Sequence, residues 1–340
     1  MIFLFLLFCL LFFAWQGIFL AKEPGAREEK AFVVEKGEGT REIALNLERQ
    51  GFIKWSPFFR IYVYSKGIAG DLQAGDYLLS PSMNIPQLAK KFAVGDIVKE
   101  AIIIKEGWNL RDIAFELEGK GIFQAEELFE LVGFPLVDYS ENNEIAMPKD
   151  FSQDFDFLTD KSKSVGLEGY LFPDTYEICK GDKLEEIIFR ILNNFDKKLT
   201  PELREEIKRQ DKSVFEVITM ASLLEKEVWL LEDKKMVAGL LWKRLESNMP
   251  LQVDATVTYI TDKKTSKVLT RETKTDSLYN TYKYRGLPLG PICNPGLESI
   301  KAALDPQDSD YWYYLSKPSG ETVFSETLWQ HNIAKAEYLK

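Results

Sequence analysis

The sequence is poor in the residue types that bind transition metals. Its 340 residues include one histidine, His331, and three cysteines. Structural zinc sites are closed by four ligands that are mostly cysteine and histidine. A structural zinc site or a histidine-rich catalytic metal site is therefore not expected. Cys9 lies in an apolar N-terminal run, which leaves Cys179 and Cys293 as one possible disulfide pair.

An excess of positive charge is also missing. Acidic residues number 53 and basic residues 43, for a formal charge of -10, and no stretch of the sequence forms a basic patch. This balance excludes nucleic acid as the main partner, because such binding depends on lysine and arginine that neutralise phosphates. No glycine-rich loop has the spacing of a phosphate-binding motif. We expect no cofactor, and chemistry that runs on carboxylates.

The first residues form a long apolar run. The stretch "MIFLFLLFCLLFFAWQGIFLA" carries no charge before Lys22 and has about the length of a helix that crosses a bilayer. It predicts a transmembrane anchor over 1–21, followed by a charged linker over 22–30. A cleaved signal peptide is the alternative, although the run is longer than a usual signal core and no basic segment precedes it. Without a basic flank, the orientation follows only from function.

A repeat defines the organisation after the linker. The segment "KGEGTREIALNLERQGFI" (36–53) recurs 70 positions later as "EGWNLRDIAFELEGKGIF" (106–123). Each copy follows a β-prone run, has apolar residues at helical spacing, and is closed by a glycine suited to a helix C-terminus. The pattern predicts a strand–turn–helix unit used twice, in an α+β chain. We expect a small βα module over 31–97, which binds glycan or only spaces the rest of the chain, and a larger domain over 98–340 whose repeat copy spans 101–123.

One glutamate stands among apolar side chains. In "GLEGYLFPDTYE" (166–177), Glu168 has Leu167, Tyr170 and Phe172 as near neighbours. Desolvation in such surroundings disfavours the charged form of a carboxyl, which can then keep its proton near neutral pH and act as an acid. The alternative is an exposed loop glutamate beside an aromatic cluster.

A second glutamate lies on the apolar face of a predicted helix. In "SVFEVITMASLLEKEV", Glu225 falls in the middle of the apolar face, whereas Glu216 and Glu227 point the other way. A glutamate at such a position must pair, hydrogen-bond or border a cavity. A structural ion pair and a role in a site are both open. We predict that Glu225 is substantially buried and lies within a side chain or two of Glu168. If it faces the same groove, it raises the pKa of Glu168 by like-charge repulsion.

Polar groups typical of sugar binding gather further along the chain. The segments "MPLQVDATVTY" and "YNTYKYRGLPLGPICNPG" contain prolines that stiffen the second of them. A rigid loop is a good wall for a cleft, so these segments predict a carbohydrate groove. The candidate groove residues are Gln252, Asp254, Thr256, Asn280, Thr281 and Tyr282.

Together these motifs resemble a known family, the membrane-anchored endolytic murein transglycosylases of the YceG-like type. The matching segments are "LEGYLFPDTY", "ASLLEKE", "MPLQVDATVTY", "YNTYKYRGLPLGPICNPGLESIKAALDP" and "FSETLWQHN", in the family's order. The resemblance implies a LysM-like module near the membrane and a mixed α+β catalytic domain whose glutamate is Glu168. It also implies a single-pass protein of the cytoplasmic (inner) membrane with its active site on the extracytoplasmic side. The implied partners are peptidoglycan glycan strands, that membrane and, as a further candidate, peptidoglycan synthases.

The implied reaction suits a single glutamate. Cleavage between MurNAc and GlcNAc needs an acid that protonates the leaving oxygen. The 6-hydroxyl of MurNAc then closes onto C1, so that the same carboxylate takes back a proton and the product ends in 1,6-anhydroMurNAc. Tyr170, Phe172 and Tyr176 are candidates for a low-dielectric wall or a platform for a sugar face.

Two other functions stay open at this point. One is a muramidase-type hydrolase, in which Glu168 is the acid and Glu225 or Asp254 directs water or stabilises charge. The other is a non-catalytic, membrane-tethered scaffold that binds peptidoglycan. Anhydro ends, reducing ends and an absence of cleavage distinguish the three.

Overall fold

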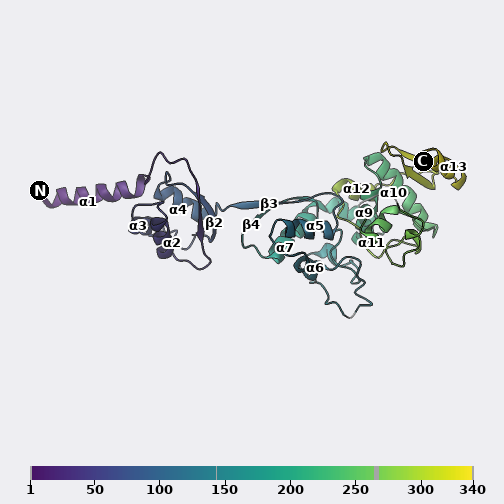
Figure 1. Ribbon diagram of the computed structural model, residues 1–340, viewed down its shortest axis with the longest axis horizontal. Coiled ribbons are helices and arrows are strands. Elements are labelled where there is room, and N and C mark those ends of the chain that lie inside the picture. Colours follow the sequence, from purple (N-terminus) through teal and green to yellow (C-terminus); the bar gives the residue numbers. More distant parts are fainter. Residues whose placement is uncertain (1, 143, 264–267, 339–340) are drawn as a thin grey trace. The chain divides into compact units, whose positions relative to one another are not determined.

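The computed structural model describes residues 2–142, 144–263 and 268–338, and it divides into two compact units (Figure 1). The first unit comprises Met1–Ala101 together with Glu177–Asp182, and the second comprises Ile102–Tyr176 and Lys183–Lys340. The sequence gives no sign that the short segment 177–182 belongs to the first unit.

The first unit is a small two-stranded sheet covered by helices. Strands β1 and β2 pair antiparallel, with Phe32 opposite Tyr77, and alternate residues on each strand are buried. The side chains of Phe32, Leu47, Phe59, Tyr77 and Phe92 form the centre of its core. The unit is thus a mixture of helices and strands, while the predicted module over 31–97 and its likeness to a LysM module stay predictions. The elements are α1 (Ile2–Phe19), β1 (Lys30–Val34), α2 (Thr40–Arg49), α3 (Ser56–Lys66), β2 (Gly75–Leu79) and α4 (Ile85–Val94).

The predicted repeat is confirmed. In both copies a strand leads through a glycine of positive φ, Gly37 (94°) or Gly107 (77°), into a helix that starts three residues later. The helices, α2 and α5 (Leu110–Gly119), are followed by Gly51 and Gly121, also at positive φ, where glycine avoids the strain that a Cβ would bring. In the second copy the strand is β3 (Lys99–Ile104), which pairs with β4 (Asp174–Cys179).

The second unit is mainly helical, and helix α9 lies at its centre. Every side chain from Val217 to Leu224 is buried, because α10, α11 and α12 all contact this helix. The single apolar face that the sequence predicts for α9 is therefore wrong. The remaining elements are α6 (Ala125–Val132), η1 (Asp156–Leu158), α7 (Leu184–Lys198), α8 (Pro201–Arg209), α9 (Val214–Glu227), α10 (Leu231–Glu246), α11 (Asp254–Thr261), η2 (Glu272–Lys274), α12 (Leu297–Leu304), β5 (Tyr313–Ser316), β6 (Thr322–Ser325) and α13 (Leu328–Tyr338).

The cysteines are free thiols. Cys293 is buried, and its Sγ donates to the carbonyl of Ser222 at 3.3 Å. The disulfide between Cys179 and Cys293 that the sequence allowed is not formed in this structure.

Candidate active site

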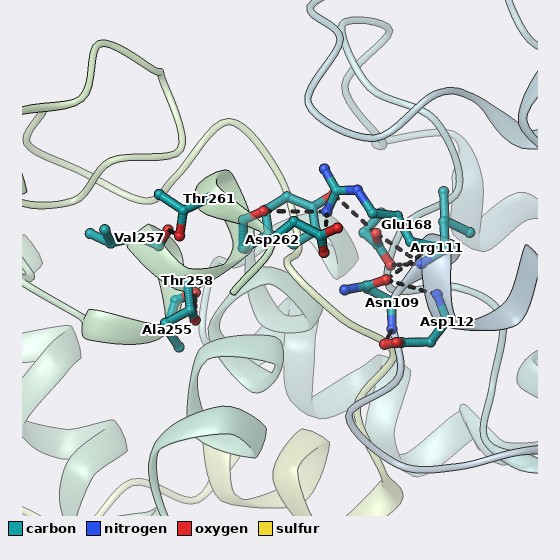
Figure 2. Close-up of polar contacts among 11 residues, drawn as sticks. Asn109, Arg111, Asp112, Glu168, Ala255, Val257, Thr258, Thr261 and Asp262 are labelled. Carbon is teal, nitrogen blue, oxygen red and sulfur yellow. Dashed lines mark hydrogen bonds and ion pairs between the residues drawn. The ribbon is translucent and has the colours of Figure 1, made fainter. Parts of the chain in front are cut away.

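The carboxyl group of Glu168 lies buried at the start of helix α5 (Figure 2). The backbone N–H of Leu110 donates to both carboxyl oxygens, at 3.1 Å each, and the hydroxyl of Tyr259 donates to Oε2 at 3.0 Å. Only 3% of the residue is exposed. The expectation of a desolvated glutamate is confirmed, and the exposed-loop alternative is excluded.

The cap of α5 leaves one backbone donor for Glu168. The Asn109 side chain accepts the N–H groups of Arg111 (2.9 Å) and Asp112 (3.1 Å), and Asp112 in turn accepts the N–H of Asn109. The first N–H groups of a helix have no partner within the helix. Because Asn109 occupies two of them, the N–H of Leu110 remains to hold the carboxylate.

A glycine lets the Glu168 turn approach the proline-rich loop. Gly169 has a φ of 90°, and a Cβ at this position would lie 2.5 Å from Cβ of Pro291. Neither the backbone conformation nor the space permits another residue there without movement. The glycine of "LEGY" therefore allows the turn that carries Glu168 to pack directly against Pro291.

Asn294 ties the Glu168 turn to the turn before α5. Its Oδ1 accepts the N–H of Leu171 at 2.8 Å, while its Nδ2 and backbone N–H donate to the carbonyl of Trp108 at 2.9 and 2.7 Å. The residue is fully buried, so it has no water to replace these partners. It lies in the "PICNPG" segment, which the sequence marks as rigid but not as part of the site.

Burial raises the pKa of Glu168 to about 7. The hydrogen bonds from Leu110 and Tyr259 and the charge of Arg111 lower it and so limit the rise, while the charge of Asp112 adds to it. The carboxylate that raises the pKa of Glu168 by like charge is thus Asp112 rather than Glu225. A carboxyl with a pKa near neutrality serves equally well as an acid and as a base.

Two tyrosines that the sequence did not single out surround the same carboxyl. The rings of Tyr259 and Tyr279 lie 5.2 Å apart, and the guanidinium of Arg111 lies 5.1 Å from the Tyr259 ring. Burial and the charge of Glu168 raise the pKa of Tyr279, so its hydroxyl stays protonated. Both tyrosines belong to the quoted motifs "DATVTY" and "YNTY". These motifs were the feature of the sequence that could have identified them.

The aromatic residues next to Glu168 in sequence are buried in the core. Tyr170 packs beside the rings of Phe157 and Phe195, and the hydroxyl of Tyr176 donates to the carbonyl of Phe172 at 2.6 Å. All three candidates are at most 5% exposed. Their position suits a low-dielectric wall, whereas a platform for a sugar would need an exposed ring face.

Glu225 is almost buried, as predicted, but it caps a different helix. Its Oε2 accepts the N–H of Gly296 at 3.0 Å and the hydroxyl of Ser299 at 2.5 Å, both at the start of α12. Lys234 of α10 pairs with it at 3.4 Å, and both side chains are at most 10% exposed. These contacts hold α9, α10 and α12 together.

The groove candidates divide into a buried set and an exposed set. Thr281 accepts the N–H of Val253 at 3.0 Å and lies 3.1 Å from the hydroxyl of Thr256, while Asn280 donates to two carbonyls of the preceding loop. These three are buried and position the loops around α11. Gln252 and Asp254 are exposed, and Asp254 accepts the hydroxyl of Tyr282 at 2.5 Å.

Glu227 forms a second carboxyl site at the other end of α11. It accepts the N–H of Ala255 at 3.2 Å and the hydroxyl of Tyr314 at 2.9 Å. Burial, and then the charge of Asp254, raise its pKa to about 7. The sequence placed Glu227 on the side of α9 that faces away, and this was wrong because α11 covers that side. One short helix is thus held by a protonatable glutamate at each end.

Comparisons with known proteins agree with the motifs. Residues 32–337 match the YceG-like family. A protein of Bacillus subtilis named endolytic murein transglycosylase is 34% identical over 93% of this chain and 88% of its own length. One of the same name from Streptococcus pneumoniae is 30% identical over 96% of this chain, which spans 62% of that longer protein. The crystal structure of a YceG-like protein from Listeria monocytogenes superposes with a TM-score of 0.60 at 33% identity, covering 91% of this chain and 99% of that one.

Proposed function

Because the chain belongs to the YceG-like family, we propose that it is an endolytic murein transglycosylase that cuts peptidoglycan strands between MurNAc and GlcNAc. The observation that carries the proposal is the buried carboxyl of Glu168, whose pKa is raised to about 7. The names of the relatives in Bacillus and Streptococcus support the same activity.

In the proposed mechanism Glu168 first acts as an acid. Its proton moves to the glycosidic oxygen as the bond between C1 of MurNAc and that oxygen breaks, so GlcNAc leaves as an alcohol. The 6-hydroxyl of the same MurNAc bonds to C1 and releases its proton to the Glu168 carboxylate. The enzyme is restored, no water is consumed, and the new strand end is 1,6-anhydroMurNAc.

The partners of Glu168 support both halves of this cycle. The N–H of Leu110 and the hydroxyl of Tyr259 donate to the carboxyl oxygens and so stabilise the anion that the first step creates. Without them burial would hold the proton too tightly. The ring of Tyr279 lies 5.2 Å from that of Tyr259, so its hydroxyl is a candidate donor to the sugar at the cleavage point.

A hydrolase would need a second carboxylate within about 5–10 Å of the first across the scissile bond. Glu225 is engaged by Lys234 and Ser299, and Asp254 by Tyr282, which gives each a structural task. We therefore favour transglycosylation. The other candidate groove residues enter the proposal as walls of the groove, with the exposed Gln252 and Asp254 in contact with substrate.

The membrane is the second part of the proposal. Helix α1 is the one helix in the described part of the chain that is long and apolar enough to cross a bilayer, with a mean hydropathy of 2.5. We propose that it anchors the protein in the cytoplasmic membrane with both units on the outer side, where murein and its synthases lie. A signal sequence passes the same test of length and composition.

Mass spectrometry of purified peptidoglycan digested by the protein tests the activity. Fragments ending in 1,6-anhydroMurNAc are expected, and they should be lost in Glu168→Gln. Reducing ends would show hydrolysis, and an absence of cleavage by the wild-type chain would favour a binding scaffold.

A further inference from the structure

Helix α3 of the first unit is apolar on the side that faces away from the core. It buries Phe59 and Val63, yet Ile61 is 56% and Tyr64 60% exposed, and Trp55, which precedes its first residue, is 49% exposed. A surface helix of a soluble domain usually carries polar residues on its outer face. An outer face of large apolar and aromatic side chains marks a surface that contacts something else.

The charge of this segment has one sign. Residues 54–66 contain Lys54, Arg60 and Lys66, all exposed, and no acidic residue, in a chain whose formal charge is -10. Tryptophan and tyrosine beside lysine and arginine is the composition of helices that lie in a membrane interface, where the rings sit at headgroup level. The long cationic side chains reach to the headgroups.

The same helix packs against the end of α1. The ring of Phe13 lies 4.8 Å from that of Trp55 and 5.8 Å from that of Phe58, and Phe19 meets Tyr62 edge-on at 6.5 Å. Gly17 lies so close to the Phe58 ring that a Cβ there would overlap it. The aromatic side of α3 is thus continuous with the candidate membrane span.

The position of the first charge sets the depth of this contact. No charged residue precedes Lys22, so the membrane surface lies near it. At about 1.5 Å per residue, Phe13 lies about 9 Å inside the C-terminal end of α1 at Phe19, and Lys22 lies beyond that end. The headgroup region on each side of a bilayer is only about 6–8 Å thick. Phe13, and with it Trp55, therefore reaches the edge of the hydrocarbon core.

We propose that α3 is an interfacial helix, whose Trp55, Ile61 and Tyr64 insert into the outer leaflet beside α1 while its cations bind anionic phospholipid headgroups. This inference rests on the anchor role proposed for α1. The bilayer is chosen over a protein partner because the apolar face continues that of α1 and its charge complements an anionic membrane.

Site-directed spin labelling of the full-length chain in phosphatidylcholine/phosphatidylglycerol vesicles tests this. With the native cysteines replaced, labels are placed at Ile61 and Tyr64, at Phe5 within α1 as a lipid reference, and at the exposed Arg41 of α2 as a water reference. Collisions with oxygen and with a water-soluble nickel chelate then report depth. Labels at 61 and 64 should show several-fold lower nickel accessibility than the label at 41.

Water-like labels at 61 and 64, with a lipid-like label at Phe5, would overturn the inference and leave the anchor standing. Water-like labels at all four positions would overturn both. Glycan cleavage by the same labelled proteins is measured in parallel. It reports folding and activity, so failure of the proposed enzyme is seen separately.

Charge reversal provides a second test. Arg60→Glu with Lys66→Glu should raise the nickel accessibility of a label at Tyr64 in vesicles that contain phosphatidylglycerol. Arg41→Glu with Arg49→Glu makes the same change of charge on exposed positions of α2 and should have no effect on that label. Equal responses of the two pairs would contradict headgroup binding by α3.

Discussion

The hydroxyl of Tyr259 donates a hydrogen bond of 3.0 Å to Oε2 of Glu168, 91 positions earlier in the chain. Burial alone would raise the pKa of this carboxyl further, because no protein group would then stabilise its charged form. The phenol at the end of α11, with the N–H at the start of α5, holds the pKa near 7, where the group can give and recover a proton.

Glu168→Gln should abolish cleavage and leave the fold intact. The amide is nearly isosteric and keeps an oxygen for the N–H of Leu110, but it has no acidic proton. General acid–base catalysis contributes a factor of about 10²–10⁴, and the loss should lie at or above the upper end. Release of anhydro-ended fragments is the readout. Near wild-type release by the variant would place the acid elsewhere.

Tyr259→Phe should shift the pH dependence of cleavage. A hydrogen bond to the charged form lowers a carboxyl pKa, so its removal raises the pKa of Glu168 above about 7 and moves the pH–rate profile to higher pH. The maximal rate should fall several-fold, because an acid of higher pKa gives up its proton less readily. Tyr284→Phe is the control, because the Tyr284 hydroxyl donates to the exposed Asp276. Matching profiles for the two variants would refute the role given to Tyr259.

Stability should depend on pH through Glu168. Its pKa rises from 4.5 in the unfolded chain to about 7 in the folded protein. Between these values the folded state binds more protons, so the free energy of unfolding falls as pH rises through the window, by on the order of 3 kcal/mol. Relative to wild type, Glu168→Gln should gain stability on going from pH 4 to pH 8. Denaturant titrations at both pH values test this, with the exposed Glu126→Gln as control.

Glu225→Gln should affect folding more than the pH profile of activity. Removing the charge leaves Lys234 buried without its partner, which typically costs about 3–5 kcal/mol. A lower thermal midpoint with an unchanged pH–rate profile is expected. If instead the profile shifts while stability is kept, Glu225 tunes Glu168 after all.

Asn294→Ala should weaken both the fold and catalysis. The change leaves the buried N–H of Leu171 without a partner, at about 1–3 kcal/mol, and removes one of the two donors to the carbonyl of Trp108, which keeps the backbone N–H of residue 294. The turn that carries Glu168 should loosen, and kcat should fall more than KM rises. Asn193→Ala removes an amide that bonds only locally, to the Phe189 carbonyl, and serves as the control.

The sequence could predict the burial of Glu168 because its signal is local. A carboxylate among apolar neighbours can be recognised from a few consecutive residues. Each copy of the strand–turn–helix repeat is likewise recognised from one short segment. The partners of Glu168 could not be found in this way, since Leu110 and Tyr259 are 58 and 91 positions away. Such pairings depend on how helices pack.

Helix α9 shows the limit of periodicity. A helical wheel assigns one apolar face, but this helix is covered by neighbours on several sides, so the polar Thr219 and Ser222 are buried as well. For the same reason Glu227, read as outward-facing, lies against α11. The burial of Glu225 was predicted correctly, but its partners on α10 and α12 had no local signature.

The repeated unit places opposite demands on its two helix starts. Proline is favoured at the first helical position, and the backbone of both preceding residues, Gly39 and Asn109, is extended, as a following proline requires. At Thr40 the N–H makes no hydrogen bond with the described residues, so proline there would remove none. At Leu110 the same substitution would delete the amide that holds Glu168. The two helix starts of the repeat therefore differ in which amino acids they can accept, and the difference comes from a single N–H.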